Sequence, residues 1–145
     1  MHEFKLTPER KAQIASDDYE NLIESLLAFA RRLLEQHGEF FPFGATVDMQ
    51  GKVAHVAGHL GTEQPTPQDL ITFLSAALRS GIEQRQFRAC GLAVNVGARL
   101  PGYPDKVDAI CCQLQAEGKP SLQVFVPYRQ TANGWEYDQL VVLGS

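Results

Sequence analysis

The sequence predicts an α+β fold, with one antiparallel sheet of about five to six strands and two main helices in the order α-β-β-α-β-β-β-β. Apolar residues recur every three or four positions in two long segments and alternate with other residues in several shorter ones. Glycine-containing turns separate several of the alternating segments. The 145 residues match one domain of ordinary size, which can bury a core without disulfides or a structural metal. We therefore expect one domain over residues 1–145, with residues 1–16 as an N-terminal arm or short helix.

The first helix is expected within residues 7–37, where apolar side chains keep to one helical face. These positions are Tyr19, Leu22, Ile23, Leu26, Leu27, Ala30, Leu33 and Leu34. Asp17 and Glu20 have the spacing of a capping box, and Gly38 is a typical C-terminal stop. The regular helix is therefore expected to begin near Asp17 and to end before Gly38.

The second helix is expected to open at Thr66-Pro67 and to end near Gln86. Its apolar positions are Leu70, Phe73, Leu74, Ala77, Leu78 and Ile82. The next strand, from Ala89 to Ala98, is expected to have one apolar side and one side of small residues.

Turns predict the register of the strand pairs. With Gln50-Gly51 as a two-residue turn, Ala45 lies opposite Val56 on the core face, and His55 lies on the other face. With a turn at Asn133-Gly134, Val126 lies opposite Val141 and Arg129 opposite Asp138. A loop at Gly118-Lys119-Pro120 sets Cys112 against Val126.

The last three strands are expected to be apolar on both faces. The back of these strands carries Cys111, Phe125, Pro127, Leu140 and Val142, where a solvated face would be polar. Such a sheet needs two covers, either one helix on each face or both helices on one face and another chain on the other. These five residues are therefore the candidate interaction surface, for a second copy of the chain or for another protein.

Composition limits the possible functions. The formal net charge of -4, with 13 basic residues spread along the chain, predicts no nucleic-acid partner. The N-terminus lacks an apolar signal core and no apolar run has the length of a membrane span, so we expect a cytoplasmic protein with no membrane partner. Three cysteines, two of them adjacent, do not form a disulfide framework, and we expect reduced thiols.

No pattern of residues predicts catalysis, a metal or a cofactor. His55 and His59 have helical spacing but lie in or just beyond an extended segment, where four residues span about 13 Å. Cys111 and Cys112 point to opposite faces of a strand, and the sequence offers no base to activate a thiol. No Gly-x-Ser-x-Gly turn or phosphate-binding loop is present. We therefore expect no catalytic residue, no cofactor-binding residue and no metal-binding residue in this chain.

Three short motifs resemble a group of small uncharacterised bacterial α+β proteins. They are Glu39-Phe-Phe-Pro-Phe-Gly44 after the first helix, Asp108-Ala-Ile110 at a strand start, and Val124-Phe-Val-Pro-Tyr128. The likeness runs from about Leu33 to Tyr137 and implies a bacterial cytosolic origin, with no catalytic residue to carry over. The element order also resembles roadblock or profilin-like domains, in which a sheet flanked by helices is a platform for dimerisation or docking.

These observations favour a non-enzymatic protein-interaction module: an adaptor, a regulator or an immunity-type protein, with homodimerisation as one possibility. A different function stays open. A small-molecule-binding protein or an enzyme could use a pocket formed by the loops around Phe41, Gly58 to Gly61 and Leu100 to Asp105.

Overall fold

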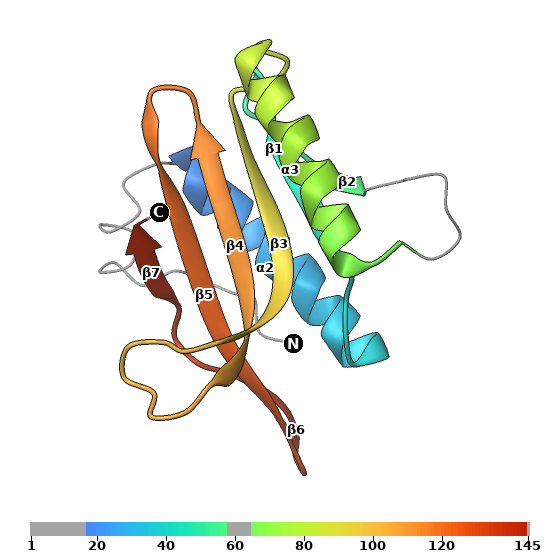
Figure 1. Cartoon of the computed structure of the whole chain (residues 1–145), viewed down its shortest axis with the longest axis vertical. Coiled ribbons are helices and arrows are strands. Elements are labelled where there is room, and N and C mark those ends of the chain that lie inside the picture. The colour runs from blue at the N-terminus through green and yellow to red at the C-terminus, as the bar shows by residue number, and fades with distance from the viewer. Residues whose placement is uncertain (1–16, 58–64, 145) are drawn as a thin grey trace.

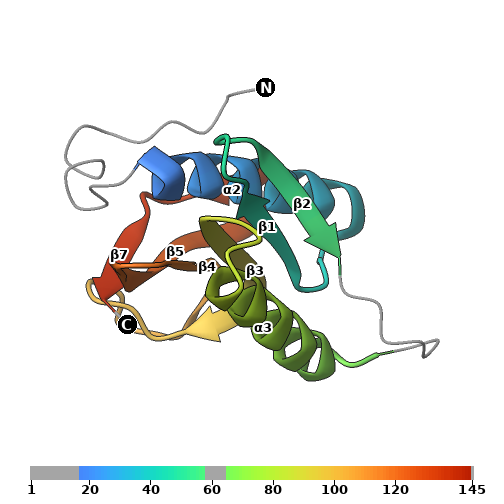
Figure 2. The same cartoon turned by 90° about the horizontal axis from the view of Figure 1, so that it is seen from above.

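The computed structural model describes residues 17–57 and 65–144, and it confirms the predicted α+β class. The expected arm at residues 1–16 and the loop at Gly58 to Gly61 lie outside the described residues. An antiparallel sheet separates two helices, which lie on opposite faces of it (Figures 1 and 2). The elements are α2 (Asp17–His37), β1 (Phe43–Val47), β2 (Val53–Ala57), α3 (Pro67–Glu83), β3 (Ala89–Ala98), β4 (Val107–Ala116), β5 (Lys119–Thr131), β6 (Gly134–Tyr137) and β7 (Val141–Gly144).

The sheet has seven strands, and its main path runs β2-β1-β3-β4-β5-β6. The strand β7 also pairs with β5, along Leu122 to Phe125, while β6 pairs with the other end of β5. The sequence predicts four strands after the second helix and the structure has five, because the last predicted strand is two short strands, β6 and β7, separated by residues 138–140.

The helix α2 covers what we call the first face of the sheet. It spans Asp17–His37 and ends before Gly38, as the sequence predicts, and the N–H of Gly38 donates to the carbonyl of Leu34 at 2.7 Å. Gly38 has φ = 78°, the left-handed conformation that commonly terminates a helix. The buried side of α2 packs on a core that extends from β1 to Leu140, and each fully buried Leu or Ile there contributes about 1.5–3 kcal/mol.

The helix α3 covers only part of the second face. Its N-terminus carries the capping box of Thr66 and Asp69, with Pro67 in the first turn. Leu74 and Leu78 pack against Cys90, Leu92 and Val94 of β3. The helix ends at Glu83 and not near Gln86, because the chain turns at Arg85, where φ is 58°. In the described part of the chain, α3 has substantial contact with β1 and β3 alone among the strands.

The register of the β1–β2 hairpin differs from the prediction by one residue. Ala45 lies opposite His55, not Val56, and Val47 lies opposite Val53. The connection contains three residues and not two, because the Asp48 carboxylate accepts hydrogen bonds from the N–H groups of residues 50 and 52, and Gly51 has φ = 90°. In this register the side chains of Val53 and His55 lie on the first face. The prediction placed Val56 on that face and His55 on the opposite one.

The β4–β5 register differs by two residues, so every side chain keeps its predicted face. Cys112 lies opposite Val124, where Val126 was expected. The β5–β7 register differs by one residue and therefore reverses the faces: Val141 lies opposite Phe125, not Val126.

An extra residue before β7 causes this reversal. The N–H of Asp138 donates to the carbonyl of Pro127, and the next pair is Phe125 with Val141. One residue of β5, Val126, thus lies opposite two residues, Gln139 and Leu140, as in a β-bulge. At the hairpin turn, Gly134 pairs with Thr131, so Arg129 lies opposite Glu136 rather than Asp138.

Candidate interaction surface

The second face of the sheet has a part that α3 does not cover, formed by β4, β5 and β7. Two rows of directly paired residues cross it. One row is Cys111, Phe125 and Val141, and the other is Gln113, Gln123 and Leu143. Cys111 is buried, whereas the other five side chains are partly or fully exposed. We call these five residues, Gln113, Gln123, Phe125, Val141 and Leu143, the exposed strip.

The five candidate residues from the sequence do not lie on one face. Cys111, Phe125 and Pro127 lie on the second face, with Cys111 and Pro127 buried. Leu140 is only 3% exposed in the core beneath α2, and Val142 packs against that same core. These two placements correct the prediction, because the one-residue shift before β7 turns both side chains to the first face.

Sequence reasoning missed Val141 and Leu143, which take the places expected for Leu140 and Val142. The segment Leu140-Val-Val-Leu143 is apolar throughout. Its composition therefore gives no alternation from which the outward residues could be chosen.

A shallow groove of about 200 Å³ adjoins the exposed strip, between α3 and the strands β4 and β5. Its wall includes Ser75 and Arg79 from α3, and its floor includes Gln113 and Gln123. Among the described residues, Arg79 has no ion-pair partner. This groove does not involve Phe41, which is 61% exposed, or the segment Leu100 to Asp105.

The three cysteines are free and buried. Burial raises the pKa of the Cys90 thiol to about 12 and that of Cys111 to about 11, and it raises the pKa of Cys112 as well. A thiol with such a pKa is protonated at neutral pH, and the protonated form is a poor nucleophile. These thiols therefore belong to the apolar packing of the sheet.

One pair with catalytic residue types does come together, although the sequence did not predict it. The hydroxyl of Ser25 lies 2.7 Å from Nε2 of His55, whose ring stacks on Phe29 at 5.0 Å. Ser25 is inside α2, where the neighbouring backbone N–H groups are used by the helix and cannot stabilise an oxyanion. The contact therefore serves to hold the edge strand β2 against α2. It depends on the hairpin register, which brings His55 to the first face.

No group of three His, Cys, Asp or Glu side chains converges on a possible metal site within the described ranges. His59, the second histidine of the spaced pair, lies outside these ranges. His37 is exposed in the last turn of α2, where a cation interacts favourably with the helix dipole.

None of the helices described is long and apolar enough to cross a membrane. No protein-family model matches the chain, and no curated protein or solved structure matches it at a significant level. The candidate surface therefore rests on its own geometry: two uncharged rows across β4, β5 and β7, beside a groove that α3 borders.

Proposed function

We propose that this chain is a non-enzymatic protein-interaction module, of the adaptor or regulator class, that self-associates through the exposed strip. The observation that carries the proposal is the half-covered second face. The helix α3 lies over β1 and β3, while Phe125, Val141 and Leu143 remain partly exposed beside it. Apolar side chains in a contiguous patch on a sheet are a common basis of docking surfaces.

The chemistry of the exposed strip favours a second copy of the chain as the partner. The strip contains no charged residue, so two copies would not repel each other there. Gln113 and Gln123 each carry an amide that donates and accepts hydrogen bonds, and such a group can pair with its own copy. A two-fold interface brings the same patch of both subunits together, which requires this kind of self-complementarity.

The size of the groove favours a protein partner over a small ligand. Its volume of about 200 Å³ is below the range of roughly 300–1,000 Å³ typical of small-molecule sites. The groove shares Gln113 and Gln123 with the exposed strip, so it extends the docking surface rather than forming a separate site.

The test compares Phe125→Glu with Phe73→Glu in the full chain. Phe73 is 42% exposed on α3 and lies outside the strip, which makes it a matched control. The mass of each protein in solution is measured by light scattering over a range of concentrations, with circular dichroism to check that each is folded.

We expect the wild type and Phe73→Glu to form dimers and Phe125→Glu to be a folded monomer, because a buried unpaired charge strongly opposes association. A monomeric wild type at the highest concentration would contradict self-association. A Phe125→Glu protein that dimerises as strongly as the wild type would show that the interface lies elsewhere.

A further inference from the structure

The connection between β3 and β4, residues 99–106, lies over the second face of the sheet, on the same side as α3 (Figures 1 and 2). It covers a different part of that face, near the point where β6 and β7 join β5. Leu100 within it is buried, and Tyr103 is partly buried. Beneath this end of the sheet, Ala109 and Pro127 pair directly and are both almost completely buried, although α3 does not extend over their strands.

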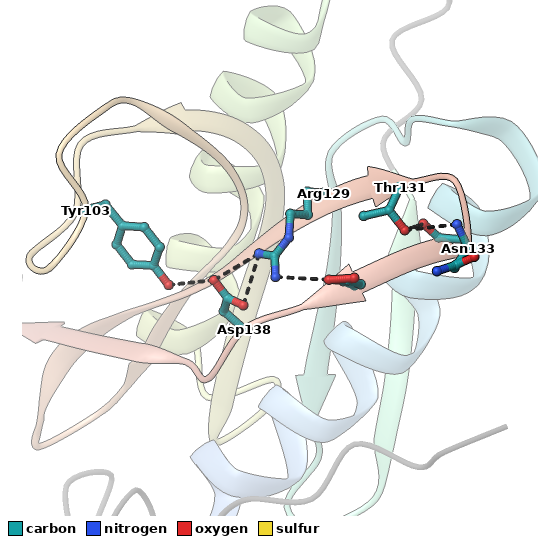
Figure 3. Close-up of polar contacts among 7 residues, drawn as sticks. Tyr103, Arg129, Thr131, Asn133 and Asp138 are labelled. Atoms are coloured by element: carbon teal, nitrogen blue, oxygen red, sulfur yellow. Dashed lines mark hydrogen bonds and ion pairs between the residues drawn. The ribbon is translucent and has the colours of Figure 1, made fainter.

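One hydrogen bond ties this connection to another element of the described structure. The hydroxyl of Tyr103 donates to Oδ2 of Asp138 at 2.9 Å (Figure 3). Another hydrogen bond of the connection is internal, from the N–H of Tyr103 to the carbonyl of Leu100. Within the described ranges, no further hydrogen bond or ion pair fastens residues 99–106 to another element.

The acceptor of that hydrogen bond is held in place from the opposite side. Nη1 of Arg129 lies 3.2 Å from Oδ1 and 3.3 Å from Oδ2 of Asp138 (Figure 3). Nη2 of Arg129 binds Glu136 at 3.0 Å. Partial burial and the contact with Asp138 raise the pKa of Tyr103, so its hydroxyl keeps its proton at neutral pH. The hydrogen bond is therefore available under physiological conditions.

We infer that residues 99–106 form a movable strap, latched by the Tyr103–Asp138 hydrogen bond, whose release lengthens the docking surface. An open strap would uncover Ala109, Pro127 and the neighbouring Cys111, all uncharged and on the same face as Phe125. These residues continue the exposed strip along β4 and β5. The effect on self-association rests on the proposed function, whereas the strap and its latch do not.

Cys111 is the reporter, because it lies two residues along β4 from Ala109, on the same face, and is only 3% exposed. The experiment measures alkylation of the native protein by N-ethylmaleimide at low concentration, with mass spectrometry to assign each modified cysteine. The variant is Tyr103→Phe, which removes only the hydroxyl. The matched control is Tyr137→Phe, since the Tyr137 hydroxyl also contacts a carboxylate, Glu35 at 3.4 Å, but comes from the neighbouring strand β6.

We expect Tyr103→Phe to accelerate alkylation of Cys111 by about tenfold, the factor corresponding to the loss of one hydrogen bond to a carboxylate. Cys90 and Cys112 serve as internal references, and their rates should not change. Arg129→Ala, which frees Asp138 to move, should give a smaller acceleration at Cys111. Tyr137→Phe should leave all three rates as in the wild type.

If the alkylation rate of Cys111 in Tyr103→Phe equals that of the wild type, the proposal of a movable strap is wrong. An equal rise at all three cysteines would also overturn it, since that result indicates global unfolding. Light scattering then separates the two proposals: we expect Tyr103→Phe to dimerise more tightly than the wild type. Faster alkylation of Cys111 without tighter dimerisation would support the strap and contradict self-association through this face.

Discussion

The guanidinium of Arg88 binds both carboxylate oxygens of Asp18, with Nε–Oδ2 and Nη2–Oδ1 distances of 3.0 Å each. Nη1 of Arg88 also donates to the carbonyl of Met49 at 3.3 Å. One side chain thus joins the start of β3 to the first turn of α2 and to the β1–β2 connection. Bidentate contacts of this geometry restrict both partners more than a single ion pair does.

We predict that Arg88→Ala lowers the midpoint of thermal unfolding by a few degrees, because three contacts between separate elements are lost together. Arg88→Lys should recover only part of the difference, since an ammonium cannot form the two parallel bonds. Circular dichroism during heating measures both. The control is Arg85→Ala, because the Arg85–Glu117 pair is 3.5 Å long and both side chains are largely exposed. A loss as large in the control would contradict the special role of Arg88.

Gly81 permits the close approach of α3 to Phe87. A Cβ atom at this position would overlap Cζ and Cε1 of the Phe87 ring. We predict that Gly81→Ala destabilises the protein by about 1–2 kcal/mol, because displacement of the ring outweighs the roughly 1 kcal/mol by which Ala favours a helix over Gly. Urea unfolding measures the difference. In a Phe87→Ala background the ring is gone, and the same substitution should become stabilising; continued destabilisation there would assign the cost to something other than the ring.

The β5–β7 register predicts opposite roles for two adjacent residues. Leu140 is 3% exposed beneath α2, whereas Val141 faces outward beside Phe125. We predict that Leu140→Ala costs about 3 kcal/mol of unfolding free energy and that Val141→Ala costs about 1 kcal/mol or less. Urea unfolding at low protein concentration keeps any effect on self-association separate. A larger cost at Val141 than at Leu140 would indicate the register that the sequence alone suggested.

Long periodic elements were predictable from the sequence because their signals are repeated many times. The helix α2 repeats its apolar spacing over 21 residues, so its C-terminal end and its buried face are as expected. The Thr66-Pro67 start of α3 was predictable for another reason, since its capping box is a local contact within a few residues. The faces of β4 and β5 also followed from alternation, although their register did not.

The candidate surface was only partly predictable because it depends on single-residue differences in register. The carboxylate of Asp48 creates a three-residue connection where Gln50-Gly51 suggested a two-residue turn. The extra residue at 139–140 reverses the faces of Leu140 to Leu143. Because this segment is apolar throughout, it has no alternation of polar and apolar residues from which the reversal could be predicted. The first feature depends on a local turn that the Asp48 carboxylate stabilises, and the second on pairing between β5 and β7. The spacing of apolar residues in the sequence shows neither.

The buried thiols predict a loss of stability at alkaline pH. Their pKa values are raised in the folded state from the usual value of 9.0, to about 12 for Cys90 and about 11 for Cys111. The unfolded chain therefore releases protons above pH 9 that the folded chain retains. Stability from this source is fully present below pH 9 and is lost as the pH rises. Each of the three thiols should cost about 1.4 kcal/mol at pH 10 relative to pH 8, and together about 4 kcal/mol.

Urea unfolding at both pH values, under reducing conditions, measures this loss. The control is a variant with Cys90, Cys111 and Cys112 all replaced by Ala, which keeps every tyrosine. Tyrosine ionisation then affects both proteins alike, and the difference between them isolates the thiols. We expect the wild type to lose about 4 kcal/mol more than the variant between pH 8 and pH 10. Equal losses in the two proteins would mean that the thiols ionise in the folded state, which is incompatible with their burial in the sheet.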